Sequence, residues 1–340
     1  MPIQGIATAV KNKWEGIPET FHPPVLTTAQ KICRVVWNVL SVLIPIIGLY
    51  RLIAYGIGRL AHRAFLPAMF YDEETKQFYR KLFQTRCLER SPHFEVIHQK
   101  VETPDGAKLD VTLFRHRNGN AETPTTLYFG GNGMLKGMNG GDWILEESLE
   151  NKIPMNLVVF DYRSVGDSEG TFNGAKDLLV DGATVVRWIR DFVKTPDHLI
   201  HFHGMSLGGG VALKVKAADP KLTGNLLHER SFSSIEEVIR AHAARLGCWL
   251  KPFVPLVVSI AKNQDLELDA VADVNKLKGP RLFVHHVEDP IILHLGSLAI
   301  KMPRQETYEL KGGDAWGDHH CLPIHFYDGA RKTVSTFMFA

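Results

Sequence analysis

The sequence predicts an α/β fold with a mainly parallel central sheet flanked by helices, preceded by an apolar helical extension. From about residue 124 onward, short apolar β-rich runs alternate with segments of helical periodicity. This alternation is typical of a parallel sheet covered on both faces. With 340 residues, of which 45% are hydrophobic and 22% charged, the chain can bury a substantial core.

The first part of the chain, residues 1–90, is expected to form the helical extension, with an apolar region at 35–66. Sixteen uncharged residues separate Arg34 from Arg51, and Pro45 interrupts them. Since a bilayer-spanning helix needs about 20 apolar residues, this run is short. Three arrangements stay open: a helix lying in the membrane interface, a true span, and a helical cap packed on the core. Aromatic residues and flanking arginines favour the interface.

The catalytic domain is expected over residues 91–340. An amphipathic helix at 72–85 leads into it, and an antiparallel hairpin opens it around the turn at 103–106. The expected hairpin strands lie at 94–101 and 108–115, the parallel strands at 125–129, 156–160, 199–203, 225–228, 281–286 and 306–310, and the main helices at 175–193 and 207–218.

Residues 234–266 are a candidate cap segment of this domain. They include a long apolar stretch around Trp249 and Phe253. Two interpretations stay open: a cap helix that lines a hydrophobic acyl pocket, and a buried helix that covers the sheet.

Charge and cysteine content exclude some function classes. The formal net charge is only +2 and the chain has no run of Lys or Arg, so no nucleic-acid partner is expected. The four cysteines, Cys33, Cys87, Cys248 and Cys321, have no CxxC spacing. This argues against a zinc site or a disulfide framework and favours a reducing compartment.

A candidate nucleophile follows one of the expected strands. Residues 204–208 read Gly-Met-Ser-Leu-Gly, directly after an apolar run and before a helix-compatible segment. In this motif the serine occupies a strained strand-to-helix turn, where larger neighbours would collide with the adjoining elements. The following helix N-terminus favours developing negative charge. We therefore expect Ser206 to act as a nucleophile.

A nucleophilic serine needs a base and an acid, which follow it in the order serine, acid, histidine. The base is expected in the glycine-rich loop 312–320, with His319 as the choice and His320 as the alternative. The acid is expected just past the penultimate strand. There Asp289 is the choice, since it would orient the imidazole and stabilise its cation, and the adjacent Glu288 stays open.

An oxyanion hole made of backbone amides completes the expected site. One donor is expected at Leu207, next after the nucleophile. The other is expected at Asn132, in the loop 130–133 that reads Gly-Gly-Asn-Gly. This loop lacks the Walker lysine and the dinucleotide glycine spacing, so phosphate binding is not favoured. Such a site requires no metal or organic cofactor.

Several ordered motifs resemble those of the α/β-hydrolase superfamily. Residues 129–133 resemble its Phe-His-Gly-Asn-Ala loop, 161–170 its Asp-Tyr-Arg-Gly-Tyr-Gly-x-Ser-x-Gly segment, and 203–209 its nucleophile elbow. The resemblance covers about residues 94–335. Within the superfamily the pattern is most similar to BEM46-type hydrolases. It also resembles the chlamydial CHLPS protein family and related Legionella hydrolases.

Two departures from the family pattern leave the catalytic groups intact. Gly130 stands where the family has a histidine, although that side chain is not the oxyanion donor. Ser164 and Val165 replace Gly-Tyr after Arg163, in a segment that supports loop architecture.

The residues and the resemblance together imply a serine hydrolase of carboxylic esters or thioesters, acting through an acyl-enzyme on lipid-like substrates. The alternatives are a peptidase or amidase, an acyltransferase, and a non-catalytic binding or effector protein. We expect a membrane surface as a partner through residues 35–66 and a membrane-associated, cytoplasm-facing location. The chlamydial and Legionella resemblance adds the expectation of delivery into a host cell.

Overall fold

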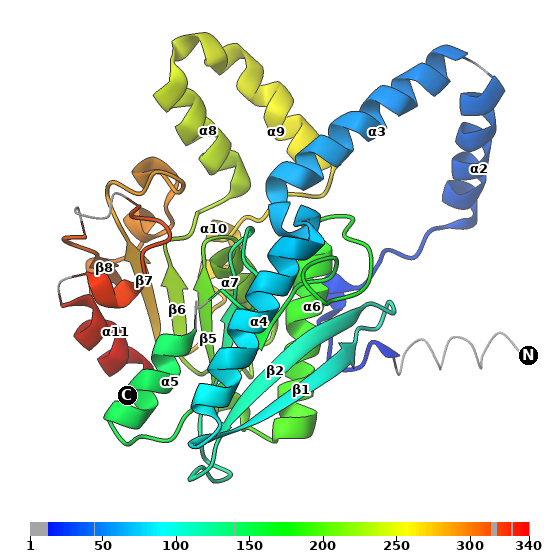
Figure 1. The fold of residues 1–340 in the computed structure, drawn as a ribbon. Coiled ribbons are helices and arrows are strands. Elements are labelled where there is room, and N and C mark those ends of the chain that lie inside the picture. The colour runs from blue at the N-terminus through cyan, green and yellow to red at the C-terminus, as the bar shows by residue number, and fades with distance from the viewer. Residues whose placement is uncertain (1–12, 44, 139–140, 314–317, 328, 340) are drawn as a thin grey trace, which may run out of the picture.

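An eight-stranded sheet forms the centre of the molecule in this computed structural model (Figure 1). The structure describes residues 13–43, 45–138, 141–313, 318–327 and 329–339, and for 39–43, 45–54, 248 and 325 the backbone alone. The strands, in chain order, are β1 (Phe94–Glu102), β2 (Lys108–His116), β3 (Thr125–Phe129), β4 (Asn156–Phe160), β5 (Ile200–Met205), β6 (Leu226–Glu229), β7 (Arg281–His285) and β8 (Thr307–Glu309).

The sheet is mainly parallel. Its strands lie in the order β1-β2-β4-β3-β5-β6-β7-β8, and only the pairs β1–β2 and β2–β4 are antiparallel. The expected entry hairpin is present, with Phe94 opposite His116 and its turn at Gly106, which has φ 93°. Each expected parallel strand is found, with ends shifted by at most two residues. The predicted α/β fold with a mainly parallel central sheet is therefore confirmed.

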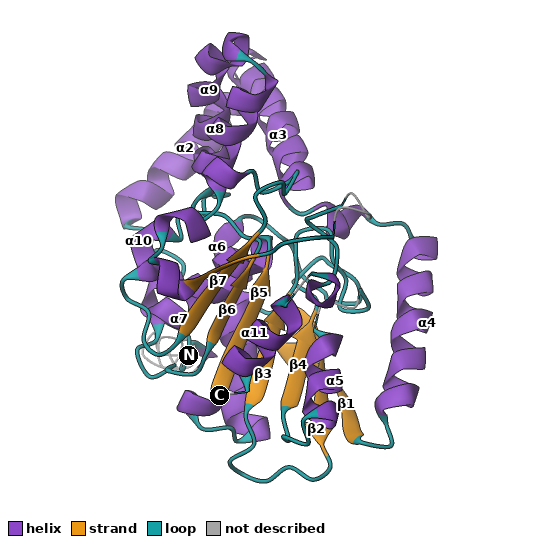
Figure 2. Ribbon diagram, turned by 90° about the vertical axis from the view of Figure 1, so that its left-hand side faces the viewer, coloured by secondary structure: helices purple, strands orange, loops and turns teal. Residues whose placement is uncertain are grey.

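Helices cover both faces of the sheet (Figure 2). The α-helices are α2 (Thr28–Leu43), α3 (Pro45–Phe65), α4 (Glu73–Arg90), α5 (Asp142–Glu150), α6 (Ala175–Trp188), α7 (Leu207–Ala218), α8 (Ile235–Leu246), α9 (Val254–Asn263), α10 (Val271–Val274) and α11 (Ala330–Met338). Shorter 3₁₀ helices include η2 (Pro67–Phe70), η5 (Cys248–Phe253) and η10 (Ile324–Phe326), and a π-helical turn, η3 (Ile189–Val193), extends α6.

Two hydrophobic clusters, one on each side of the sheet, form the core. One cluster packs α6, α7 and α10 against one face of the sheet, through residues such as Val185, Val211 and Phe129. The other joins α4, α5 and α11 to the opposite face through residues such as Phe83 and Ile144. Successive strand side chains point to opposite faces, so both clusters draw on the same strands.

Residues 28–43 and 45–65 form two helices that stand away from the sheet (Figure 1). α2 ends at Leu43 and α3 begins at Pro45, whose missing N–H is tolerated at the start of a helix. Among the residues that the structure describes, none of the helices is both long and apolar enough to cross a membrane.

The segment 234–266 folds as a helical hairpin beside α3. It consists of α8, the 3₁₀ turn η5 and α9, and it projects from the end of the molecule that also carries α3 (Figures 1 and 2). The Ser234 hydroxyl caps α8 by accepting the Glu237 N–H at 3.1 Å. Because the hairpin leaves many apolar side chains exposed, it does not act as a fully buried sheet-covering layer.

Candidate active site

Ser206 occupies the turn between β5 and α7. Its backbone has φ 53° and ψ −122°, a conformation that residues other than glycine rarely adopt. The turn is held because the Ser206 N–H donates to the Glu229 carbonyl at 3.0 Å and the Ser206 carbonyl accepts from the Gly209 N–H at 3.0 Å. The local strain therefore fixes where the hydroxyl lies.

The glycines of the motif allow backbones to approach closely. A Cβ at Gly204 would lie 2.4 Å from the Gly208 carbonyl oxygen, and a Cβ at Gly208 would lie 2.1 Å from the Phe129 carbonyl oxygen. Real Cβ atoms do not approach oxygens this closely, so a side chain at either position would push α7 away from the sheet. The steric interpretation of the motif agrees with this packing.

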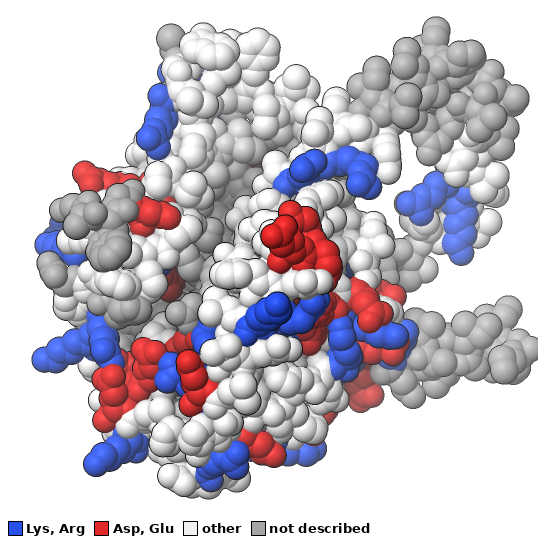
Figure 3. Space-filling model, in the orientation of Figure 1, with Lys and Arg blue, Asp and Glu red and all other residues white. Residues whose placement is uncertain are grey.

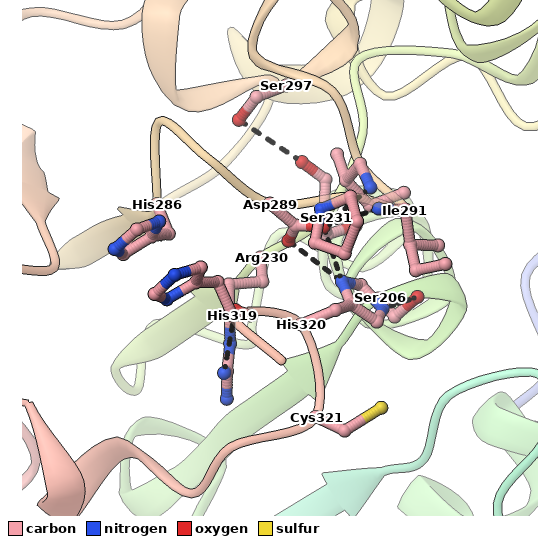
Figure 4. Close-up of polar contacts among 12 residues, drawn as sticks. Ser206, Arg230, Ser231, His286, Asp289, Ile291, Ser297, His319, His320 and Cys321 are labelled. Carbon is pink, nitrogen blue, oxygen red and sulfur yellow. Dashed lines mark hydrogen bonds and ion pairs between the residues drawn. The ribbon is translucent and has the colours of Figure 1, made fainter. Parts of the chain in front are cut away.

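A histidine and an aspartate lie in line with the serine hydroxyl (Figure 4). His320 Nε2 is 3.0 Å from Ser206 Oγ, and His320 Nδ1 is 2.8 Å from Asp289 Oδ2. With its proton on Nδ1 donated to Asp289, the imidazole leaves Nε2 to accept from the hydroxyl. Asp289 Oδ1 also accepts the N–H groups of Ile291 and Ile292, each at 2.8 Å. All three side chains are buried.

The structure places His320, the alternative, and not the chosen His319 beside Ser206. The His319 ring stacks on the His286 ring, with centroids 3.9 Å apart and planes inclined by 5°, and so points away from Ser206 (Figure 4). The Asp318 carboxylate accepts the N–H of His320 at 3.1 Å and so holds a tight turn. In this turn the His320 side chain points towards Ser206. Residues 314–317 of the same loop lie outside the described residues.

Glu288, the alternative acid, lies away from the serine. Its side chain is 73% exposed, and its carboxylate is 3.8 Å from His319 Nε2. Asp289, by contrast, is buried and contacts His320 through both carboxylate oxygens. The structure therefore brings together Ser206, Asp289 and His320 of the five residues considered for the triad.

A buried ion pair that the sequence did not indicate supports the histidine loop. Arg230 follows β6 with φ 43° and donates to the carbonyls of Leu322 at 2.6 Å and His319 at 3.2 Å. Its guanidinium also pairs with Glu229, and the Glu229 carboxylate lies 2.6 Å from His203 Nε2. Burial would raise the pKa of Glu229, but the neighbouring Arg230 and His203 hold that pKa at about 2.

The candidate oxyanion loop, residues 130–133 after β3, is tied to the N-terminal part of the chain. The Asn132 carbonyl accepts the Ala68 N–H at 3.3 Å, and the Gly133 carbonyl accepts the Tyr71 hydroxyl at 2.7 Å. A Cβ placed on Gly131 would lie 3.5 Å from Ser206 Cβ, so the loop runs close beside the nucleophile. Leu207, the other expected donor, is buried as the first residue of α7.

A cavity of about 530 Å³ opens in front of Ser206 and His320. Its apolar lining comes from Leu82, Trp143, Ile324 and several methionines, and its polar lining from residues such as Arg86. The lining residues are Tyr71, Tyr79, Leu82, Arg86, Gly131, Asn132, Gly133, Met134, Met138, Asp142, Trp143, Glu146, Met205, Ser206, Glu229, Arg230, His320, Cys321, Pro323 and Ile324. An apolar cleft with a few polar groups is the usual form of a small-molecule site.

One of the two interpretations of residues 234–266 placed that segment on the wall of an acyl pocket. Within the described part of the chain, the cavity lining contains no residue of 234–266, the candidate cap. Helix α4 supplies that wall instead, through Tyr79, Leu82 and Arg86. The amphipathic pattern of residues 72–85 was the available signal, but it does not reveal which surface the apolar face covers.

The segment after β4 supports the loops at this end of the sheet, as expected from its motif. Arg163 is buried and pairs with Asp181 at 2.7 Å and with Asp105 at 2.5 Å. Ser164 takes φ 62°, so the serine adopts the left-handed conformation at a position where the family has glycine. Its hydroxyl donates to the Gly170 carbonyl at 2.8 Å and thereby closes the loop.

Comparison with known proteins gives relatives along most of the catalytic region. Protein bem46 of Schizosaccharomyces pombe is 24% identical over 242 residues, which are 70% of this chain and 77% of that protein. Lysophosphatidylserine lipase ABHD12 is 27% identical over 187 residues in Rattus norvegicus and 33% over 174 residues in Bos taurus. The chain covers 44% and 42% of those two proteins, less than half of their length. No protein-family model matches the sequence.

Solved structures share the fold. The esterase Pf2001 of Pyrococcus furiosus aligns with a TM-score of 0.53 and 17% identity over 74% of this chain and 92% of its own. An alpha-beta hydrolase of Vibrio vulnificus aligns with a TM-score of 0.52 and 16% identity over 78% of this chain and 91% of its own. The chain therefore has the α/β-hydrolase fold, and its sequence is similar to those of bem46 and ABHD12.

Proposed function

We propose that the chain is a serine hydrolase of carboxylic esters, with Ser206 as nucleophile, His320 as base and Asp289 as the acid that orients it. The position of the His320 imidazole carries this proposal, 3.0 Å from the Ser206 hydroxyl and 2.8 Å from the Asp289 carboxylate. A serine hydroxyl becomes an effective nucleophile when such a base accepts its proton. The ABHD12 relatives are named lysophosphatidylserine lipases, and a lipase cleaves esters, which agrees with this proposal.

The proposed reaction has two halves. Ser206 Oγ attacks the acyl carbonyl while its proton passes to His320 Nε2, and Asp289 stabilises the imidazolium. When the tetrahedral intermediate collapses, the bond to the leaving oxygen or sulfur breaks and His320 returns the proton to it. Water then attacks the acyl-enzyme with His320 again as the base, and the carboxylic acid and free serine are released.

The oxyanion of both tetrahedral intermediates needs donors beside Ser206. We assign this role to the backbone N–H groups of Leu207 and Asn132. The first belongs to the N-terminal turn of α7, where N–H groups have no partner within the helix. The second lies on the loop that the Ala68 N–H and Tyr71 hydroxyl support from behind. Preorganised donors of this kind contribute about 10²–10³ in kcat.

The shape and lining of the cavity favour a lipid-like acyl group. Trp143, Met134, Met138 and Leu82 line the space in front of the serine. Arg86, Asp142 and Glu146 give the same cavity a charged side. This combination suits an ester with an apolar chain and a polar head, such as a lysolipid.

A membrane surface is the proposed location of the substrate. Residues 35–66 carry exposed Val35, Trp37, Tyr55 and Leu60, side-chain types that are stable at a bilayer interface. The described cysteines Cys33, Cys87 and Cys321 are free thiols, which agrees with a cytoplasm-facing, reducing environment. We therefore propose peripheral membrane association.

Labelling with a fluorophosphonate probe tests the nucleophile. The full chain is expected to react, and Ser206→Ala is expected to abolish the reaction. Ser297→Ala is a matched control, because Ser297 is also buried and lies near the site without contacting His320 (Figure 4). Labelling that persists in Ser206→Ala contradicts the proposal.

A substrate panel tests the reaction class. Acyl esters, thioesters and lysophospholipids are expected to be hydrolysed, and peptide anilides are expected to be poor substrates. Adding a lipid alcohol separates hydrolysis from acyl transfer, because transfer would convert the acid product into a new ester. Preferential cleavage of the peptide anilides would point to the peptidase alternative.

A further inference from the structure

The turn of the α8–α9 hairpin exposes an unusual number of large apolar side chains. We call residues 246–257 the hairpin tip. Leu246, Trp249, Phe253, Leu256 and Val257 are each between 45% and 66% exposed. Single exposed apolar residues are ordinary, but a contiguous group of this kind marks a surface that meets another apolar phase.

The charges around the tip all have one sign. Between residues 238 and 263 the basic residues are Arg240, Arg245, Lys251 and Lys262, and Asp and Glu are absent. Arg240 and Lys262 pair with Glu236 at the base of α8, which leaves Arg245 and Lys251 beside the apolar tip. Figure 3 shows blue and white atoms on the projecting α8 and α3, with red atoms lower on this face.

Helix α3 extends the same surface. α3 meets the end of α9 where a Cβ on Gly58 would lie 2.4 Å from Gln264 Oε1. Tyr55, Ile57 and Leu60 of α3 are exposed. Residues 20–71 contain five Lys or Arg and no Asp or Glu. Two segments distant in sequence thus present one apolar and cationic surface.

Both segments are rooted beside the active site. α8 begins soon after Glu229 and Arg230, and its His242 Nε2 lies 2.8 Å from the carbonyl of Ile291, whose N–H donates to Asp289. α3 leads through η2 to Ala68, which donates to the oxyanion loop. Both projections therefore connect directly to segments that contact Asp289 or the loop after β3.

We propose that the hairpin tip and the exposed face of α3 dock together on an anionic lipid bilayer, with Trp249 and Phe253 in the headgroup region. The inference rests on the proposed function, since it adds a second contact to the membrane association assigned to residues 35–66. Charge decides between a bilayer and a second copy of the chain: anionic headgroups attract Arg245 and Lys251, whereas pairing two copies of this surface would bring like charges together.

Vesicle flotation of the full chain tests the proposal. The wild type is expected to float with vesicles of phosphatidylcholine and phosphatidylserine. The double substitution Trp249→Asp/Phe253→Asp should lower the bound fraction about tenfold or more, because two aromatic side chains no longer insert. Arg245→Glu/Lys251→Glu should weaken binding about tenfold on these vesicles and have little effect on pure phosphatidylcholine.

Leu88→Asp is the matched control, since Leu88 is 73% exposed in the last turn of α4, at the end remote from α3. It should float like the wild type. Equal flotation of the Trp249→Asp/Phe253→Asp variant overturns the proposal. A second outcome also overturns it: the wild type binds no vesicles and is a dimer by light scattering, and the Trp249→Asp/Phe253→Asp variant is a monomer. The surface would then be an interface between two copies of the chain. A wild type that floats but hydrolyses no soluble short-chain ester contradicts the proposed function alone.

Discussion

Adjacent residues of the histidine loop have different surroundings. His320 contacts Ser206 and Asp289, whereas His319 stacks on His286 and gives its carbonyl to Arg230 and Tyr327. A side chain one position along a tight turn points in another direction, so only one of the pair reaches the hydroxyl.

Alanine substitutions separate the two histidines. His320→Ala is expected to lower kcat by about 10⁴-fold or more, because the base is lost. His319→Ala should stay within about tenfold of the wild type, because its backbone carbonyl, which Arg230 holds, is retained. Steady-state hydrolysis of a soluble ester measures both. A larger loss in His319→Ala than in His320→Ala contradicts the assignment.

Isosteric amides separate the two acids. Asp289→Asn should reduce kcat by about 10⁴-fold, because the amide favours the wrong imidazole tautomer. Glu288→Gln should leave kcat nearly unchanged, since its carboxylate is largely exposed and faces His319. Ester hydrolysis over a pH series gives the measurement, and an inactive Glu288→Gln with an active Asp289→Asn would reverse the roles.

Much of the candidate site follows from the sequence because its signals are local. Gly204 is required by its close approach to Gly208 within the same strand, turn and helix, and Gly208 by its approach to Phe129 on the neighbouring strand, so both appear in one short motif. The choice between His319 and His320 depends on Asp318, Arg230 and His286, which come together only in the folded chain. Residue types and spacing carry no information on that choice.

Helix α4 forms the cavity wall that one interpretation assigned to the candidate cap segment 234–266. It packs Phe83 and Cys87 into the core and places Tyr79, Leu82 and Arg86 on the cavity wall. The helical periodicity of residues 72–85 indicated the element, but its packing partner is distant in sequence. For the same reason the apolar hairpin α8–α9 was open to two interpretations, and its exposed tip agrees with neither of them.

Narrowing the α4 wall tests its role in substrate choice. Leu82→Trp adds volume where Leu82 lines the cavity. We expect kcat/KM for a decanoyl ester to fall about tenfold, while an acetyl ester is little affected, because only the long chain reaches that wall. Leu88→Trp, on the same helix but outside the cavity lining, is the control. If kcat/KM falls equally for both esters, the substitution at Leu82 acts by destabilising the protein and not by narrowing the cavity.

Arg230 links strand β6 to the histidine loop and is a positioning residue. Arg230→Lys should lower kcat about 10–100-fold with a smaller change in KM. In the wild type, Nη1 of Arg230 holds the His319 and Leu322 carbonyls while Nη2 pairs with Glu229, and a single ammonium nitrogen cannot occupy both places. Added guanidinium that partly restores kcat would identify the missing contact, and the Tm of the variant separates it from unfolding. An unchanged kcat in a folded Arg230→Lys variant contradicts the role.

At the scale of the whole molecule, Glu229 couples stability to pH. Its pKa is about 2 in the folded chain against 4.5 as the reference value. The contribution to the free energy of unfolding is therefore fully present above pH 4.5 and is lost as the pH falls towards 2. In urea unfolding, the stability difference between the wild type and Glu229→Gln should be larger at pH 6 than at pH 3. If the stability difference between the wild type and Glu229→Gln does not change with pH, Glu229 does not couple stability to pH.

The bonds from Ala68 to Asn132 and from Tyr71 to Gly133 have a practical consequence for any attempt to trim the chain. A shortened protein that starts at residue 91, the expected edge of the catalytic domain, would keep Ser206, Asp289 and His320. It would nevertheless lose one wall of the cavity and both supports behind the oxyanion loop. The smallest piece that retains both bonds includes Ala68, so the part of the chain that supports the site reaches back to η2.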